Sequence, residues 1–136
     1  MLFVSSSAED KLNVMYEAFR DIDLLDIEVI FNGEVYQDYY SKSKSFFEKF
    51  LEKIKLPIDI NSQNKKIISF CKKNKVDFLF IVKGNHIWPK TLRAIKNQNI
   101  KIISWTQDDM YLTHNRSWYY TFGLKYYDLI VTQKSY

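Results

Sequence analysis

Two apolar runs that do not alternate with polar residues constrain the fold of this 136-residue chain more than any other feature. They span Phe78–Val82 and Ile100–Trp105, and a segment of helical length that begins at Pro89 lies between them. Continuous apolar runs are typical of strands buried on both faces, and a helical crossover joins parallel strands. The stretch therefore predicts two strands of a parallel sheet.

The rest of the chain predicts three more strands and further helices. We expect strands at Leu2–Ser5, Ile27–Phe31 and Leu129–Thr132, and helices around residues 12–19, 41–55, 61–75 and 89–95 and after a cap at Asn115. Pro57 should end the second helix. This order needs right-handed crossovers, so it predicts an α/β fold, a Rossmann-like or flavodoxin-like three-layer sandwich with a mainly parallel five-stranded sheet. We expect residues 1–136 to form one such domain.

Composition excludes several classes of protein. Aromatic residues make up 17% of the chain, which argues against disorder, and three Gly leave little room for a Gly-rich phosphate loop. Cys71 is the only cysteine, so we expect no disulfide framework and a thiol buried on the apolar face of a helix. We find neither a run of transmembrane length nor a secretory signal, and therefore expect a cytoplasmic protein without a transmembrane segment.

The charge is unevenly distributed along the chain. Residues 1–40 carry nine acidic and two basic side chains, a net charge of −7, whereas residues 41–136 carry seven acidic and eighteen basic ones, a net charge of +11. These two values give the overall +4. Most of the lysines occupy isolated polar positions on amphipathic helices, and no recognition motif accompanies them. We therefore expect a solvated basic face and no specific binding of nucleic acid.

Polar residues follow both apolar runs, at the strand ends where open α/β sheets bind ligands. Asp108 and Asp109 follow the second run and could act as a general base, orient a sugar hydroxyl or hold a cation. Alternatively, one carboxylate caps a turn and the other is solvated. Because no His or Glu stands nearby at the spacing of metal ligands, we expect no metal site.

Lys83, Gly84 and Asn85 follow the first run. Gly84 would allow a positive φ or the close approach of a ligand, and Lys83 could neutralise a phosphate or a carboxylate. The alternative is a tight turn in which Asn85 hydrogen-bonds its own backbone. We expect a structural role for the neighbouring His86.

Ser5, Ser6 and Ser7 follow the first strand at the equivalent edge of the sheet. They could line the same cleft or simply cap the next helix. Trp105, at the end of a strand, could stack on a sugar or a base or pack inward, whereas we expect Trp118 in the core. The motifs of dinucleotide-binding dehydrogenases, P-loop NTPases, zinc peptidases and α/β-hydrolases are absent from the sequence.

Three stretches occur in a characteristic order: Asp77–Gly84 (DFLFIVKG), Lys101–Asp109 (KIISWTQDD) and Tyr127–Gln133 (YDLIVTQ). This order resembles the N-terminal half of CgeB-like (spore-maturation-type) glycosyltransferases of the GT-B fold. In that family a PD-hydrophobic-KG strand, a hydrophobic-W-x-x-DD strand and a yD-hydrophobic-T strand follow one another. The resemblance covers about residues 65–136. It departs from the family pattern at Ser5–Ser7, where the family has a glycine-bearing loop, and at Met110, where it often has proline.

The resemblance implies the acceptor-side half of an enzyme that transfers a sugar from a nucleotide-sugar donor to an acceptor, without a resident cofactor. The C-terminal donor domain would lie outside these 136 residues. Asp109 and Asp108 would be the base or orient the acceptor, and Ser5–Ser7, Lys83–Asn85 and Trp105 would line the cleft. The alternative is a stand-alone flavodoxin-like binding or regulatory module. A receiver module would need an acidic cluster at Ser5–Ser7 and an aspartate at Lys83.

Overall fold

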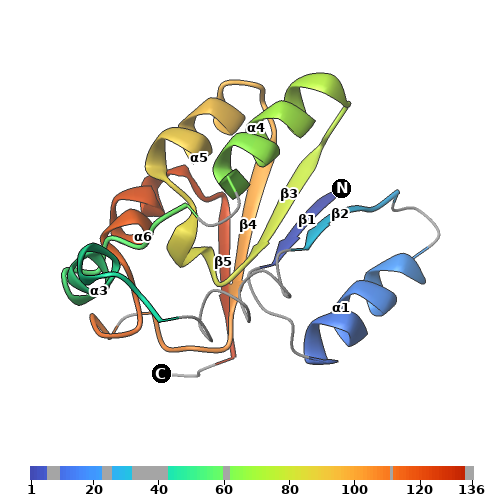
Figure 1. The fold of residues 1–136 in the computed structure, drawn as a ribbon. Helices are drawn as coiled ribbons and strands as arrows, with labels where there is room; N and C mark the ends of the chain where they lie inside the picture. The colour runs from blue at the N-terminus through green and yellow to red at the C-terminus, as the bar shows by residue number, and fades with distance from the viewer. Residues whose placement is uncertain (6–9, 23–25, 32–42, 60–61, 111, 134–136) are drawn as a thin grey trace.

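The computed structural model describes residues 1–5, 10–22, 26–31, 43–59, 62–110 and 112–133. Five strands, β1 (Leu2–Ser5), β2 (Glu28–Phe31), β3 (Phe78–Val82), β4 (Lys101–Thr106) and β5 (Leu129–Thr132), form one sheet. The strand order is β2-β1-β3-β4-β5, and every neighbouring pair is parallel. The predicted Rossmann-like and flavodoxin-like α/β fold is therefore confirmed (Figure 1).

Helices cover both faces of the sheet. The helix α1 (Asp10–Arg20) lies on one face, and α4 (Gln63–Lys73), α5 (Pro89–Lys96) and α6 (Trp118–Gly123) lie on the other (Figure 1). Short 3-10 helices, η2 (Gly84–His86) and η3 (Leu124–Tyr126), follow β3 and α6. Among the described residues we find no helix long and apolar enough to cross a membrane.

The core explains why the strands read as unbroken apolar runs. Leu2, Leu79 and Ile81 pack in a cluster on the face covered by α4 and α5. The alternate residues Phe3 and Phe80 stack on each other on the α1 face, with ring centroids 5.5 Å apart. Because side chains alternate between the faces of a strand and both faces are covered, apolar side chains are favoured on both faces. The predicted burial of Cys71 is confirmed, since its side chain joins the first cluster.

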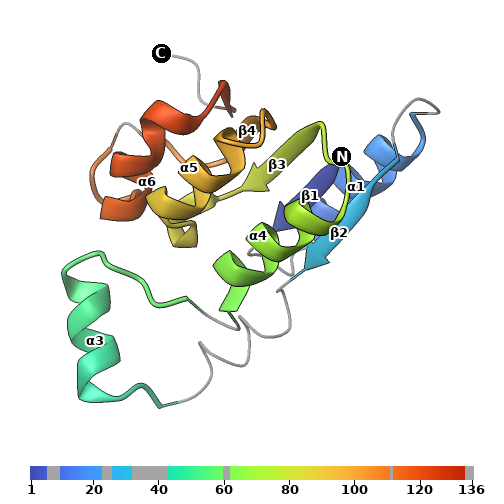
Figure 2. The ribbon, with the colours of Figure 1, turned by 90° about the horizontal axis from the view of Figure 1, so that it is seen from above.

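The helix expected over residues 41–55 is shorter than predicted and packs differently. The helix α3 spans Phe46–Lys53 and has no buried residue. Ser45 begins it with a capping box, in which the Ser45 hydroxyl accepts from the Glu48 N–H and the Glu48 carboxylate accepts from the Ser45 N–H. Its apolar face stays exposed, with Phe46 89% and Phe47 65% accessible to solvent. The helix lies to one side of the layered body (Figure 2).

The last helix also differs from expectation in its cap and its aromatic residues. Ser117, rather than Asn115, is the N-cap of α6, and its hydroxyl accepts from the Tyr120 N–H at 3.1 Å. The expectation that Trp118 packs in the core is wrong, because its side chain is 48% exposed and stacks on the exposed Phe122. Tyr120 is the buried aromatic residue of this helix.

Candidate functional site

The carboxyl ends of three strands meet at one edge of the sheet, as parallel pairing requires. Ser5 pairs in register with Val82, and Val82 pairs with Trp105. The Lys83 N–H then donates to the Trp105 carbonyl at 3.1 Å. The Lys83 ammonium lies 3.9 Å from a carboxylate oxygen of Asp108. The structure thus brings together the polar ends of β3 and β4, whereas Ser6 and Ser7 lie outside the described residues.

The acidic pair follows a turn that a threonine closes. The Asp108 N–H donates to the Thr106 hydroxyl at 3.2 Å, which turns the chain away from β4. The Asp108 side chain is 48% exposed beside Lys83. The Asp109 carbonyl accepts from the Asn115 side-chain amide at 2.8 Å, so this segment is tied to the loop before α6. A half-exposed carboxylate beside a cation can bind a polar ligand, but this geometry alone assigns it no reaction.

Lys83, rather than Gly84, has the positive φ in the turn after β3. Its φ is 51° and its ψ is 59°, in the left-handed region, whereas no described glycine has a positive φ. Gly84 is buried, and a Cβ atom on it would lie 2.6 Å from the Tyr127 hydroxyl oxygen. Close packing against Tyr127 therefore accounts for this glycine without a ligand.

Asn85 fastens the loop before α6 to the end of β3. Its side-chain amide donates to the Asn115 carbonyl at 2.9 Å, and its amide oxygen accepts from the Ser117 N–H at 2.9 Å. The Ser117 hydroxyl also donates to the Asn85 carbonyl at 2.6 Å. Both ends of the amide are thus engaged within the protein, so Asn85 positions the loop.

Trp105 lies on the other face of the sheet from these loops. Its half-buried side chain packs against the cluster of Phe3, Phe80 and Val82 on the α1 side. Packing therefore accounts for Trp105.

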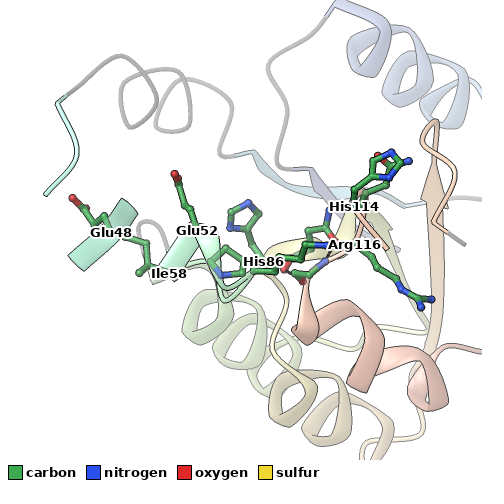
Figure 3. A pocket seen from close by; sticks show the side chains of 11 residues that line it. Glu48, Glu52, Ile58, His86, His114 and Arg116 are labelled. Atoms are coloured by element: carbon green, nitrogen blue, oxygen red, sulfur yellow. Dashed lines mark hydrogen bonds between the residues drawn. The ribbon is translucent and has the colours of Figure 1, made fainter. Parts of the chain in front are cut away.

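A pocket of about 340 Å³ opens beside this edge of the sheet (Figure 3). Glu48 and Glu52 of α3 line one side, and the following segment contributes Lys55, Pro57 and Ile58. Asn85 and His86 of η2 and residues 114–117 line the rest. Of the predicted site residues that the structure describes, Asn85 lines this pocket and the others do not.

The charged groups of the pocket have defined partners. Glu52 forms an ion pair with Lys44, and the Lys55 ammonium donates to the Thr113 carbonyl at 2.5 Å. The Ser45 N–H and hydroxyl, which contact the Glu48 carboxylate, lower its pKa. The Arg116 guanidinium lies 3.5 Å from the Met110 carbonyl.

His86 is a partly buried titratable group of the pocket. Burial lowers the pKa of its imidazole, while donation to the Ile58 carbonyl and the nearby carboxylates of Asp59 and Glu52 act in the opposite direction. The net shift is downward, so His86 is neutral at pH 7. A neutral imidazole carries one donor and one acceptor nitrogen.

Sequence reasoning missed this pocket because its residues share no spacing. They come from three separate stretches of the chain, residues 48–58, 85–86 and 114–117, and the pattern of the helix did not indicate that it would stand at the rim of a pocket. The only signal in the sequence was His86, which lies in the short turn after a buried strand and is followed by the apolar Ile87. That position was assigned a structural role.

The aspartate of the third motif has a structural explanation. One Asp128 carboxylate oxygen accepts from the Ile102 N–H at 2.8 Å, and the Lys96 ammonium donates to both oxygens at 2.8 and 2.9 Å. The hydrogen bond from Lys96, followed by that from Ile102, lowers the pKa of Asp128. Asp128 thus fastens the start of β5 to β4.

In the part of the chain that the structure describes, no three His, Cys, Asp or Glu side chains are grouped so that they could hold a metal ion. No protein-family model matches the sequence, and no curated protein and no solved structure matches it either. The fold and the residues at the carboxyl edge are therefore the basis for a functional proposal.

Proposed function

We propose that this chain is the acceptor-side domain of a GT-B glycosyltransferase. In this proposal it binds the acceptor at the carboxyl edge of the sheet, and a second domain binds the nucleotide-sugar donor. The observation that carries the proposal is the meeting of Lys83 and Asp108 at that edge, at the ends of the two strands whose motifs resemble those of the family. The parallel sheet supports it, because ligands of open α/β sheets bind at this edge.

The acidic pair then has two roles. Asp109 accepts the proton of the acceptor hydroxyl as the sugar is transferred, and Asp108 orients that hydroxyl beside Lys83. Lys83 contributes a positive charge beside Asp108 that can bind a polar group of the acceptor.

The test measures sugar transfer by a longer protein that contains the donor domain as well as these 136 residues. Asp109→Asn should lower its turnover by ~10²–10⁴-fold, the range for loss of a general base, and leave its folding intact. Asp77→Asn is the matched control, because Asp77 precedes β3 and lies at the opposite edge of the sheet. Equal turnover for Asp109→Asn and Asp77→Asn would refute the assignment. The 136-residue chain alone should transfer no sugar, since the donor site is absent.

A non-catalytic binding module is the second candidate. The pocket beside η2 favours it, because residues of this chain alone enclose the pocket and no second domain is needed to complete it. A longer protein that binds a small ligand there but transfers no sugar from any nucleotide-sugar would decide for this candidate. A receiver-type module is disfavoured, because Lys83 stands at the end of β3 where a receiver has its aspartate.

A further inference from the structure

The pocket beside η2 has the size and polarity of a small-ligand site. Its volume of about 340 Å³ is at the lower end of the range for such sites, which run from ~300 to ~1,000 Å³. It lies next to the carboxyl edge of the sheet, since Asn85 and His86 belong to η2, which begins two residues after the end of β3. A ligand in the pocket would therefore lie close to the ends of β3 and β4.

The pocket walls offer both donors and acceptors of hydrogen bonds. The Glu52 carboxylate accepts, the Lys55 ammonium donates, and the neutral His86 imidazole, whose N–H donates to the Ile58 carbonyl, has an acceptor nitrogen. Figure 3 shows the side chains of Glu52 and His86 extending in the same direction. A hydroxyl group is itself both donor and acceptor, so it can pair with every group of this set, whereas a carboxylate or an ammonium ion can pair with only part of it.

The charge of the pocket is balanced. Glu48 and Glu52 contribute two negative charges to the lining, Lys55 and Arg116 contribute two positive charges, and His86 is neutral. Figure 3 shows the Arg116 side chain directed away from Glu52 and His86. A charged ligand would therefore meet no uncompensated opposite charge. Pro57 and Ile58 add an apolar wall that suits the C–H face of a sugar ring.

We infer that the pocket formed by α3, residues 55–58, η2 and residues 114–117 binds an uncharged, hydroxyl-rich molecule, namely a sugar unit of the acceptor. The identification of the ligand as part of the acceptor rests on the proposed function. The position of the pocket and the chemical class of its ligand do not depend on catalysis.

The experiment is a titration of the 136-residue chain with methyl glycosides of glucose, galactose, mannose and N-acetylglucosamine, followed by NMR. The imidazole signals of His86 and His114 and the amides of residues 85–88 should shift for at least one glycoside. For a ligand of about 13 non-hydrogen atoms we expect a dissociation constant on the order of 1 mM. Glucose 6-phosphate and glucosamine, an anion and a cation of similar size, should bind no more tightly than methyl glucoside.

Substitutions in the pocket and away from it test whether the ligand binds there. Glu52→Gln should weaken binding about five- to tenfold, because a charged acceptor is replaced by a neutral amide. Lys44→Gln removes the ion-pair partner of Glu52 and should retain binding, which separates the carboxylate from its salt bridge. Glu17→Gln on α1, an exposed carboxylate paired with Arg20, is the distant control. Unchanged amide signals of the core residues Leu79 and Ile102 would show that each variant is folded.

Three outcomes would overturn the inference: no shift with any glycoside at ~50 mM, tighter binding of the anion or the cation, or equal binding by the Glu52→Gln variant and the wild type. Its failure is distinct from that of the proposed function. If the glycosides bind but the longer protein transfers no sugar, the inference is supported and the enzymatic role is refuted. If transfer occurs and Glu52→Gln leaves the KM for the acceptor unchanged, the enzymatic role is supported and the inference is refuted.

Discussion

Gly84→Ala should destabilise the protein because the new methyl group meets a buried hydroxyl. The added Cβ would lie 2.6 Å from the Tyr127 hydroxyl oxygen and 3.3 Å from Cγ2 of Ile81, and contacts below 3.0 Å force a neighbour to move. Extra methyl groups in a packed core cost ~1–3 kcal/mol. At ~2.1 cal/mol/K per residue, 136 residues give an unfolding entropy of ~0.29 kcal/mol/K, so each kcal/mol shifts Tm by ~3–4 °C. Thermal unfolding followed by circular dichroism should show a fall of ~4–10 °C.

Tyr127→Phe should rescue that variant. The buried Tyr127 hydroxyl has no hydrogen-bond partner among the described residues, so its removal should be neutral or raise stability by up to ~1 kcal/mol. In the double variant the alanine methyl group occupies the space that the hydroxyl left. We therefore expect a favourable coupling energy of ~1–3 kcal/mol in the double-mutant cycle.

Gly123→Ala is the matched control. Its Cβ would lie 2.8 Å from Cδ1 of Leu92, the end of a flexible side chain, and 3.8 Å from the Tyr127 ring. The helical position offsets part of the cost, since Ala favours a helix over Gly by ~0.5–1 kcal/mol. Tyr127→Phe should not rescue this variant. If the effects of Gly84→Ala and Tyr127→Phe simply add, the contact between the two residues is not the cause, and the explanation of Gly84 fails.

Three other predictions follow from the described contacts. Asp128→Asn should cost about 1 kcal/mol at pH 7, a value reduced for partial exposure. Because hydrogen bonds from Lys96 and Ile102 lower the pKa of Asp128 from its usual 3.8, this stability is present above pH ~4 and is lost as the pH falls further. The stabilities of the two proteins, measured by urea unfolding, should therefore approach each other as the pH falls below ~4. Burial raises the pKa of Cys71 to about 11, so iodoacetamide should alkylate the folded protein far more slowly at pH 8 than the protein in urea. Phe46→Ser should change stability by less than ~0.5 kcal/mol, whereas Phe3→Ala should cost ~3–5 kcal/mol; similar losses would contradict the assigned burial.

The sheet could be predicted because its signal is local and repeated. The bounds predicted for Phe78–Val82 and Leu129–Thr132 match β3 and β5, since each run is apolar throughout and ends at polar residues. Parallel pairing then places Lys83 and Asp108 at one edge without further information. The helix predicted over residues 41–55 is present as the shorter α3, Phe46–Lys53. Its position could not be predicted, because a periodic apolar face predicts a helix but not the surface on which it packs, and the faces of the sheet are covered by other helices.

The pocket could not be predicted because it depends on contacts between distant segments. Glu52 and His86 are 34 positions apart in the chain, and a hydrogen bond from the Trp118 N–H to the Lys55 carbonyl helps to hold α3 beside the loop before α6. No spacing rule connects such residues. The positive φ expected as one explanation of Gly84 is wrong, since Lys83 has it. The close approach of Tyr127 to Gly84 follows from tertiary packing, which the sequence of the turn does not contain.

The solvent-facing position of α3 has a thermodynamic consequence for any ligand of the pocket. No residue of the helix is buried, so little apolar burial opposes its separation from the loop before α6. The observed affinity is then the intrinsic affinity multiplied by the fraction of molecules in which α3 is docked. Conversely, a bound ligand shifts molecules toward the docked form, and hydrogen exchange at the amides of residues 50–54 should slow in proportion to occupancy while exchange in β3 stays unchanged. Because the apolar surface of α3 contributes nothing to the core, the docking of α3 would be weak enough for a bound ligand to change the fraction of docked molecules.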